Sequence, residues 1–128
     1  MTRETLTRFD KGTLDGYEVE KTSNYTVVTS TDSGKTFIVD SDVTFTLPAI
    51  AIGNTFTFKF VGVDGSATLT LSPNASDGIS YAGSATDDKD LILTKATARA
   101  GDYVTIASLD QVVAWQVTSV RGIWAKEA

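Results

Sequence analysis

Residues 55–60 read Thr-Phe-Thr-Phe-Lys-Phe, and this stretch decides the fold class. Its three aromatic rings occupy every second position, so in an extended strand they share one face while the two threonines and the lysine share the other. A slip of one residue would move all three rings to the solvent side, which fixes the buried face. The stretch therefore predicts a β-strand that contributes Phe56, Phe58 and Phe60 to a hydrophobic core.

Similar apolar and turn patterns recur on both sides of this strand. The predicted strands are 25–29, 36–39, 43–47, 55–61, 67–72, 91–94, 103–108 and 111–120, with turn residues such as Asp64-Gly65 between them. The other residues expected in the core are Val43, Phe45, Leu47, Leu69, Leu71, Val113, Trp115 and Val117. About eight short strands without a convincing helix predict a single all-β domain, a sandwich or jelly roll.

Charge divides the chain after residue 21. Residues 1–21 hold nine charged side chains, whereas the remaining 107 residues hold eighteen. We therefore predict a charged N-terminal arm at 1–21 and a β-domain at 22–128. The arm is either a disordered tail or a segment that becomes ordered on a partner. Its apolar side chains are candidate contacts to a capsid or to another subunit, and these are Leu6, Phe9, Leu14 and Tyr17.

Trp124 is the fifth candidate contact residue. It lies near the end of the chain, just after Gly122. Two interpretations remain open for it: its ring covers the bottom of the sandwich, or it lies in a contact between subunits.

Composition restricts the partners and the chemistry. The chain has 128 residues, no cysteine, no histidine and a net charge of −5. The lack of cysteine excludes disulfides and zinc-thiolate sites, and without a basic patch we expect no nucleic-acid partner. No stretch approaches the roughly 18 to 20 apolar residues of a membrane span, and the charged N-terminus is unlike a signal peptide. We expect a soluble protein, made in the host cytoplasm, with no membrane partner.

Three features point toward chemistry, and each has a simpler interpretation. Residues 33–36 resemble the end of a phosphate-binding P-loop, but Thr29 stands where its first glycine belongs and a strand follows where a helix should begin. Residues 87–90 lack the alternating ligands and turn glycine of a calcium loop. Lys59 is expected to be a solvated or edge-guarding lysine. General acid–base catalysis near neutral pH usually depends on histidine, which this chain lacks. On these grounds together we predict no catalytic residue, no metal and no cofactor.

Several phrases, taken in order, resemble a module of tailed-bacteriophage virion proteins. Each phrase alone is a generic β-turn signature, and their order and spacing over about residues 25 to 124 carry the resemblance. Similar modules occur in tail-fibre and tail-spike tips and in small free-standing capsid decoration, or cement, proteins. The phrases are Asp32-Ser33-Gly34-Lys35-Thr36, Thr46-Leu47-Pro48, Gly53-Asn54-Thr55-Phe56-Thr57-Phe58, Leu71-Ser72-Pro73, Asp77-Gly78-Ile79, Gly101-Asp102-Tyr103-Val104 and Trp115-Gln116-Val117.

A free-standing length favours the decoration proteins, because a fibre module is normally joined to a long shaft with repeats. The resemblance implies a virion structural protein that binds the major capsid protein on the outer capsid surface, as a trimer or another small homo-oligomer. The first alternative is a receptor-binding fibre or spike tip, for which Tyr81 is the main loop candidate. The second is a carbohydrate-binding module or carbohydrate-active enzyme, which would need exposed aromatic rings or a carboxylate pair in a groove.

Overall fold

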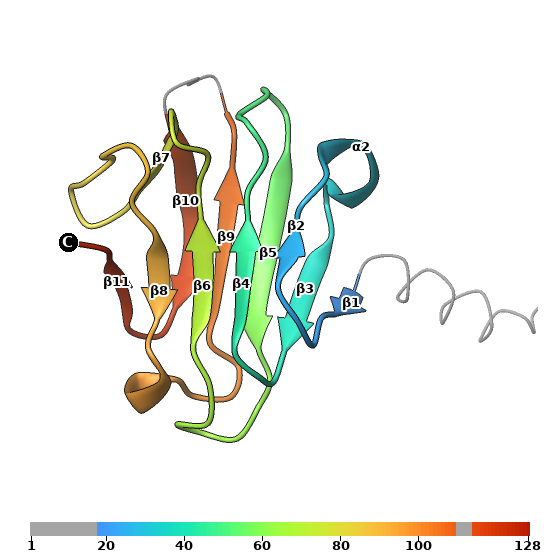
Figure 1. Cartoon of the computed structure of the whole chain (residues 1–128), viewed down its shortest axis with the longest axis vertical. Coiled ribbons are helices and arrows are strands. Elements are labelled where there is room, and N and C mark those ends of the chain that lie inside the picture. Colours follow the sequence, from blue (N-terminus) through green and yellow to red (C-terminus); the bar gives the residue numbers. More distant parts are fainter. Residues whose placement is uncertain (1–17, 110–113) are drawn as a thin grey trace, which may run out of the picture.

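The computed structural model describes residues 18–109 and 114–128, which form two mixed β-sheets. Sheet A has six strands in the order β1-β3-β5-β9-β10-β7, and sheet B has five in the order β11-β8-β6-β4-β2 (Figure 1). The all-β class predicted from the sequence is confirmed. The strands are β1 Glu18–Glu20, β2 Tyr25–Thr26, β3 Thr36–Val39, β4 Val43–Thr46, β5 Thr55–Phe60, β6 Leu69–Ser72, β7 Gly78–Ser80, β8 Leu91–Leu93, β9 Tyr103–Ala107, β10 Ala114–Arg121 and β11 Trp124–Lys126.

Through its first six strands the chain alternates between the two sheets. Each strand pairs parallel with the strand two places earlier, so β1, β3 and β5 are neighbours in sheet A and β2, β4 and β6 are neighbours in sheet B. The strands β9 and β8 then pair antiparallel with β5 and β6, respectively, and β7 pairs parallel with β10. Both sheets are therefore mixed, whereas a jelly roll is built from antiparallel strands.

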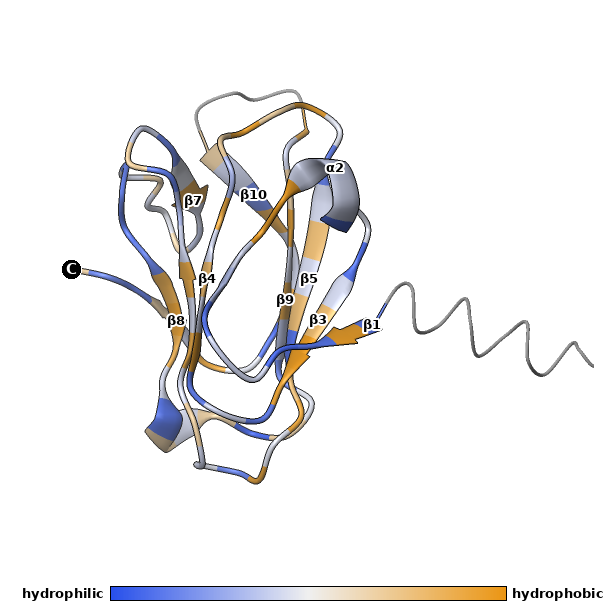
Figure 2. Cartoon of the chain, turned by 45° about the vertical axis from the view of Figure 1, so that its right-hand side comes forward, coloured by the Kyte–Doolittle hydropathy of each residue, from blue (hydrophilic) through white to orange (hydrophobic). Residues whose placement is uncertain are grey.

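The buried apolar side chains form one core. Figure 2 shows hydrophobic residues along the strands of both sheets. Phe58 is fully buried, and its ring lies 5.5 Å from that of its sheet A neighbour Phe37 and 4.9 Å from that of Phe45 in sheet B. Aromatic pairs of this kind contribute about 0.5 to 1.5 kcal/mol beyond the burial of their surface. Val117 is half-buried and Val113 lies outside the described residues. The other residues predicted for the core are buried: Val43, Phe45, Leu47, Phe56, Phe58, Phe60, Leu69, Leu71 and Trp115.

The structure corrects the predicted elements in two ways. Three strands were missed, namely β1, β7 and β11, and β1 lies within the range 1–21 that the sequence assigned to the arm. The predicted strand 25–29 ends early, because a helical turn, α2, covers Thr29–Asp32. A 3-10 turn covers Lys95–Thr97. The α2 turn is held by the side chain of its last residue, Asp32, whose carboxylate accepts hydrogen bonds from the Tyr25 hydroxyl and the Val28 amide.

Candidate binding surfaces

Among residues 18–109 and 114–128 there is neither a pocket nor a group of acidic side chains arranged to hold a metal ion. The segments that were weighed for chemistry have other contacts. The amide of Gly34 donates to the carbonyl of Thr55, which fixes the turn that leads into β3. Lys35 pairs with Asp32 at 3.3 Å, and Asp87 and Asp88 are exposed on a loop.

Tyr25 closes the side of the sandwich where β1 and β2 end the two sheets. Its ring contacts Phe37 and Phe45, with centroid distances of 5.6 and 6.4 Å. The ammonium of Lys21 lies 3.7 Å from the centre of the same ring, a cation–π geometry. The Tyr25 hydroxyl donates a 2.8 Å hydrogen bond to Asp32, so this ring is both packed against the core and fixed by a polar contact.

Asp32 is the polar anchor of this side and is only 2% exposed. Its carboxylate also accepts the Val28 amide at 2.8 Å and the Lys35 ammonium at 3.3 Å. Burial alone would raise the pKa of Asp32, but these hydrogen bonds and the charge of Lys35 hold the pKa below its ordinary value. The hydrogen bond to Asp32, with burial and the negative charge, raises the pKa of Tyr25. The arrangement is a structural anchor.

The opposite side of the sandwich carries a second group of charges. Burial raises the pKa of Asp90, and the negative charges of Glu127 and Asp88 act in the same direction against a hydrogen bond from Ser72. Burial lowers the pKa of Lys126, against the opposing effect of Asp90 and Glu127. The amide of Asp90 donates to the Glu127 carboxylate at 3.0 Å, which holds the end of the chain to the start of β8.

The outer face of sheet A carries a row of hydroxyl side chains. Strand pairing places Thr36, Thr57, Thr105 and Ser119 side by side across β3, β5, β9 and β10. The hydroxyls of Thr57 and Thr105 are 2.9 Å apart and share a hydrogen bond. The uncharged residues that point outward from the middle of this sheet are named the sheet A face: Thr36, Thr55, Thr57, Thr105, Gln116 and Ser119.

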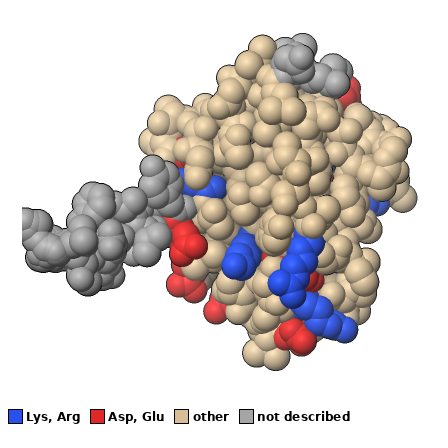
Figure 3. All heavy atoms as spheres, turned by 180° about the vertical axis from the view of Figure 1, so that it is seen from behind, with Lys and Arg blue, Asp and Glu red and all other residues tan. Residues whose placement is uncertain are grey.

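Cationic side chains border the sheet A face at its lower end. Lys59, Tyr103 and Arg121 lie side by side in the next row of the sheet. Arg121 lies 4.0 Å from the buried carboxylate of Asp102, and Arg99 lies 3.9 Å from the exposed Asp64. Figure 3 shows this side of the molecule, where a broad area without charged side chains lies above a group of lysine and arginine side chains.

Whereas the outward residues of sheet A include Glu18, Glu20, Lys59 and Arg121 toward its borders, the outer face of sheet B is uncharged in the described strands. Its outward residues in register include Thr44, Thr70 and Ile92 in one row and Thr26, Thr46 and Ser72 in another. The middle of both sheets therefore presents mostly short polar side chains to the outside and large apolar ones to the core. The two faces differ in their borders, because no cationic row follows these two rows of sheet B among the paired residues of the described strands.

Exposed apolar side chains collect in loops rather than on either face. Ile52 and Leu109 are 65% and 52% exposed in two loops that are joined by a hydrogen bond from the Gly53 amide to the Ser108 carbonyl. Val63 and Ile123, in other loops, are 77% and 67% exposed.

The structure places one of the five predicted contact residues. Trp124 is 5% exposed in β11, where its indole N–H donates to the Arg121 carbonyl at 3.0 Å, so its ring covers the core. A role for Trp124 between subunits stays a prediction. Tyr81, the loop candidate for an adhesin, is half-buried and packs against the core. The four predicted contacts in the arm, Leu6, Phe9, Leu14 and Tyr17, lie outside the described residues.

The rows of hydroxyl side chains were not predicted as a functional feature. Their signal was present in the sequence, because Thr55 and Thr57 alternate with buried rings and Thr105 alternates with Val104 and Ile106. What the sequence could not supply is the pairing of β5 with β9, which joins segments almost fifty residues apart and turns separate threonines into one surface.

No protein-family model and no curated protein sequence matches this chain. None of the helices in the part that the structure describes has the length and apolarity to cross a membrane.

Proposed function

We propose that this protein is a structural component of a tailed-bacteriophage virion, which binds the outer surface of the capsid and stabilises it as a decoration protein. The observation that carries the proposal is the pair of threonine-rich outer faces, uncharged at their centres, on a small body whose interior is filled by packed rings. The order of the turn phrases in the sequence points to the phage virion. The partner is then the major capsid protein, and the protein acts without catalysis.

The uncharged faces support binding to protein, because the centre of a protein–protein interface is typically depleted in charged side chains. A surface of threonine, serine and glutamine loses little hydration energy when it is covered, provided that its hydroxyls keep hydrogen-bond partners. The bond between Thr57 and Thr105 already satisfies the donor of one of these hydroxyls and an acceptor position of the other within the chain. Such a surface can be buried against a partner without stranding a charge.

Stabilisation of a shell follows from mass action. A protein that binds the assembled, expanded shell and not its precursor lowers the free energy of the expanded state, by about 2.7 kcal/mol per site at a hundredfold excess over Kd. A small homo-oligomer, with a trimer as the favoured form, would engage several capsid subunits at once and gain avidity without new contacts. Decoration therefore needs only modest contacts from each copy.

Co-sedimentation tests this proposal. The full chain is mixed with undecorated expanded shells assembled from the major capsid protein encoded in the same genome, and with unexpanded precursor shells as the control. We expect saturable binding to the expanded shells, weak binding to the precursor, and a higher temperature of shell disruption after binding. An absence of binding to expanded shells would refute the proposal, as would a genome without a major capsid gene.

A further inference from the structure

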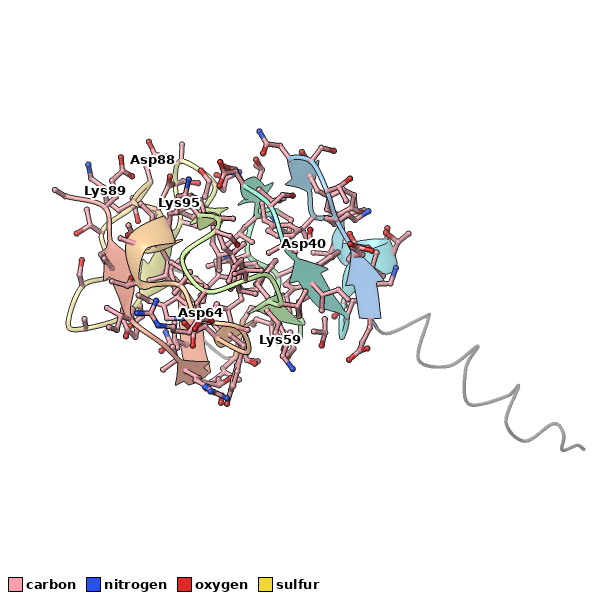
Figure 4. All side chains as sticks on the ribbon, turned by 90° about the horizontal axis from the view of Figure 1, so that it is seen from below. Asp40, Lys59, Asp64, Asp88, Lys89 and Lys95 are labelled. Carbon is pink, nitrogen blue, oxygen red and sulfur yellow. The ribbon has the colours of Figure 1, made fainter. Side chains whose placement is uncertain are left out.

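The first six strands form a coil with two strands in each turn, and the coil begins at an open edge. Each strand crosses to the other sheet, as at Asp40 between β3 and β4, which Figure 4 labels in a view from below. At the start of the coil, β1 ends sheet A and β2 ends sheet B, and no strand among the described residues pairs with the outer edge of either (Figure 1). Because the coil alternates between the sheets, a strand that preceded β1 would belong to sheet B, beside β2.

The inward rings of the coil recur at a regular spacing along the chain. From an inward ring in sheet B, the chain reaches the next inward ring in sheet A after twelve or thirteen residues. The two pairs are Tyr25 with Phe37 and Phe45 with Phe58. Val19 pairs with Phe37 and is the inward residue of β1. A spacing of thirteen leads from Val19 back to Leu6.

Leu6 also has the sequence neighbours that the strands of sheet B have. In β2, β4 and β6, an inward residue follows a short polar residue and precedes a hydroxyl residue. These sheet B triplets are Asn24-Tyr25-Thr26, Thr44-Phe45-Thr46 and Thr70-Leu71-Ser72, and they lie side by side in register. Thr5-Leu6-Thr7 has the same order, and no other triplet within residues 1–17 has it.

The backbone at the outer edge of β2 is oriented to accept another parallel strand. The amide just beyond one sheet B triplet donates to the carbonyl at the end of the next triplet. The bonds are Val27 to Thr46 and Leu47 to Ser72, at 2.9 and 2.8 Å. Because successive residues of a strand alternate in direction, the amide and carbonyl of Thr26 point to the outer edge. The next bond of this series would run from the amide of Arg8 to the carbonyl of Thr26.

Apolar side chains beside this edge are incompletely covered. Tyr25 is half-buried, although it packs against the core, and Val28 is 44% exposed. In the register of the triplets Leu6 lies beside Tyr25, and Phe9, three residues later, lies beside Val28. The Lys21 ammonium is 3.7 Å from the centre of the Tyr25 ring, and its long, flexible side chain can turn aside into solvent.

From these observations we infer that residues 5–7, which lie outside the described residues, pair in parallel with the outer edge of β2 in the same chain and extend sheet B by one strand. Residues 8–17 then cross to β1, and these ten residues are enough, because the connections 27–35 and 47–54 make the equivalent crossing with nine and eight. The tether also gives the segment a high effective concentration at this edge. The inference holds whether or not the protein binds a capsid.

Paired cysteines test this strand directly, because the natural chain has no cysteine. In the register of the triplets Thr7 lies beside Thr26, and neighbouring strands are about 4.8 Å apart, which is within the reach of a disulfide. The full-length variant Thr7→Cys/Thr26→Cys is compared with Thr13→Cys/Thr26→Cys under mild oxidation, and mass spectrometry follows the cross-linked products. If the segment did not dock, the control pair would close faster, because it encloses the shorter loop.

We expect the Thr7→Cys/Thr26→Cys variant to form a cross-linked monomer at least tenfold faster than the control, with circular dichroism showing that both variants are folded before oxidation. Equal rates, or a faster control, would overturn the inference. A cross-linked dimer as the main product would mean that a second copy supplies the segment, and the assignment to the same chain would then be wrong.

Hydrogen exchange at the Thr26 amide gives a second test without cysteines. Docking supplies this amide with a carbonyl acceptor, so in the natural full-length chain we expect its exchange to be slowed. Leu6→Asp places a charge where the segment packs on Tyr25 and should speed this exchange at least tenfold. Leu14→Asp is the matched control, because Leu14 lies outside the triplet, and it should leave the rate unchanged. The same rate in the natural chain and in both variants would overturn the inference.

Discussion

The ammonium of Lys126 donates a 2.7 Å hydrogen bond to the backbone carbonyl of Ile79. Lys126 belongs to β11 at one edge of sheet B, and Ile79 belongs to β7 at the matching edge of sheet A. A further bond of 3.1 Å runs from the same ammonium to the carbonyl of Lys89. The Lys126 side chain therefore bridges the two sheets at the edges opposite Tyr25. Polar hydrogen bonds thus link the chain at both pairs of sheet edges, by Tyr25 and Asp32 at one and by Lys126 at the other.

We predict that Lys126→Met lowers the free energy of unfolding by about 1 to 2 kcal/mol near neutral pH, because two carbonyls lose a charged donor while burial of the ammonium no longer costs energy. Urea-induced unfolding followed by tryptophan fluorescence measures the change. Lys95→Met is the matched control, since Lys95 is exposed, and its effect should stay within about 0.5 kcal/mol. Equal effects of the two substitutions would show that the bridge is not stabilising.

The same bridge gives a pH dependence of defined sign. Because burial lowers the pKa of Lys126, the unfolded chain binds a proton more strongly than the folded chain between the lowered pKa and the ordinary value of 10.5. The contribution of Lys126 to stability therefore rises with pH across that window. Tyr25 acts in the opposite direction above 10.0, because its pKa is raised in the folded state. We expect the Lys126→Met variant to lose stability more steeply than the natural chain as the pH rises toward 10.

Asp32 gives a dependence of stability on pH in the acid range. Its pKa is lowered in the folded state, so its contribution is present above the ordinary value of 3.8 and is lost as the pH falls through the lowered value. We predict that Asp32→Asn costs about 1 to 3 kcal/mol near neutral pH, and that this cost shrinks below pH 3.8 because the natural chain then loses the same interaction. Urea-induced unfolding near neutral pH and below pH 3.8 measures the cost of the substitution at each pH.

Asp40→Asn is the control for that experiment, because Asp40 is an exposed aspartate with the same chemistry. Its effect should be small at either pH. A cost of Asp32→Asn that does not change between neutral and acid pH would mean that shape, and not the charge of the carboxylate, holds the α2 turn and Tyr25.

The sequence predicted the fold class because the buried strands alternate strictly. The rings of residues 55–60 are all inward, and the predicted strand 36–39 matches β3 at both ends. Alternation with a period of two can be recognised within a single strand, because it separates the inward from the outward residues without reference to the neighbouring strands. The parallel pairing could not be read in this way, because it depends on which strands meet and not on the pattern within any one of them.

The missed elements depend on contacts made from a distance. Gly78 reads as a turn residue after Asp77, yet it pairs with Ala114 in β10. Trp124 has no alternating neighbours long enough to indicate a strand, and β11 consists of three residues beside β8. The candidate surface was missed for the same reason, since Thr57 and Thr105 become neighbours only when β5 and β9 pair.

Gly78 gives a further prediction, because backbone passes directly over it. A Cβ at this position would collide with the carbonyl oxygen of Ala85 and lie 3.0 Å from that of Thr86, and neither atom can rotate away. We expect Gly78→Ala to destabilise the protein by about 2 to 3 kcal/mol through overpacking. Gly83→Ala is the control, since a Cβ there meets nothing within 4 Å and only its φ of +82° opposes the change, at about 1 kcal/mol. If the two variants unfold at the same urea concentration, the close approach is not rigid.

The two tryptophans allow a paired test of buried hydrogen bonding. Both rings belong to the core, but the indole N–H of Trp124 donates to the Arg121 carbonyl, whereas that of Trp115 has no partner among the described residues. Substitution by phenylalanine removes similar apolar area from each site. At position 124 it also removes a hydrogen bond, and at position 115 it removes a buried donor whose lost hydration costs about 1 to 3 kcal/mol.

Trp115→Phe should therefore cost at least about 1 kcal/mol less than Trp124→Phe in the free energy of unfolding, although Trp115 is the more deeply buried of the two. Circular dichroism follows the unfolding, because the substitutions change the fluorescence signal itself. The opposite order would contradict the prediction: either cavity formation outweighs hydrogen bonding in this core, or the Trp115 indole has a hydrogen-bond partner in solution.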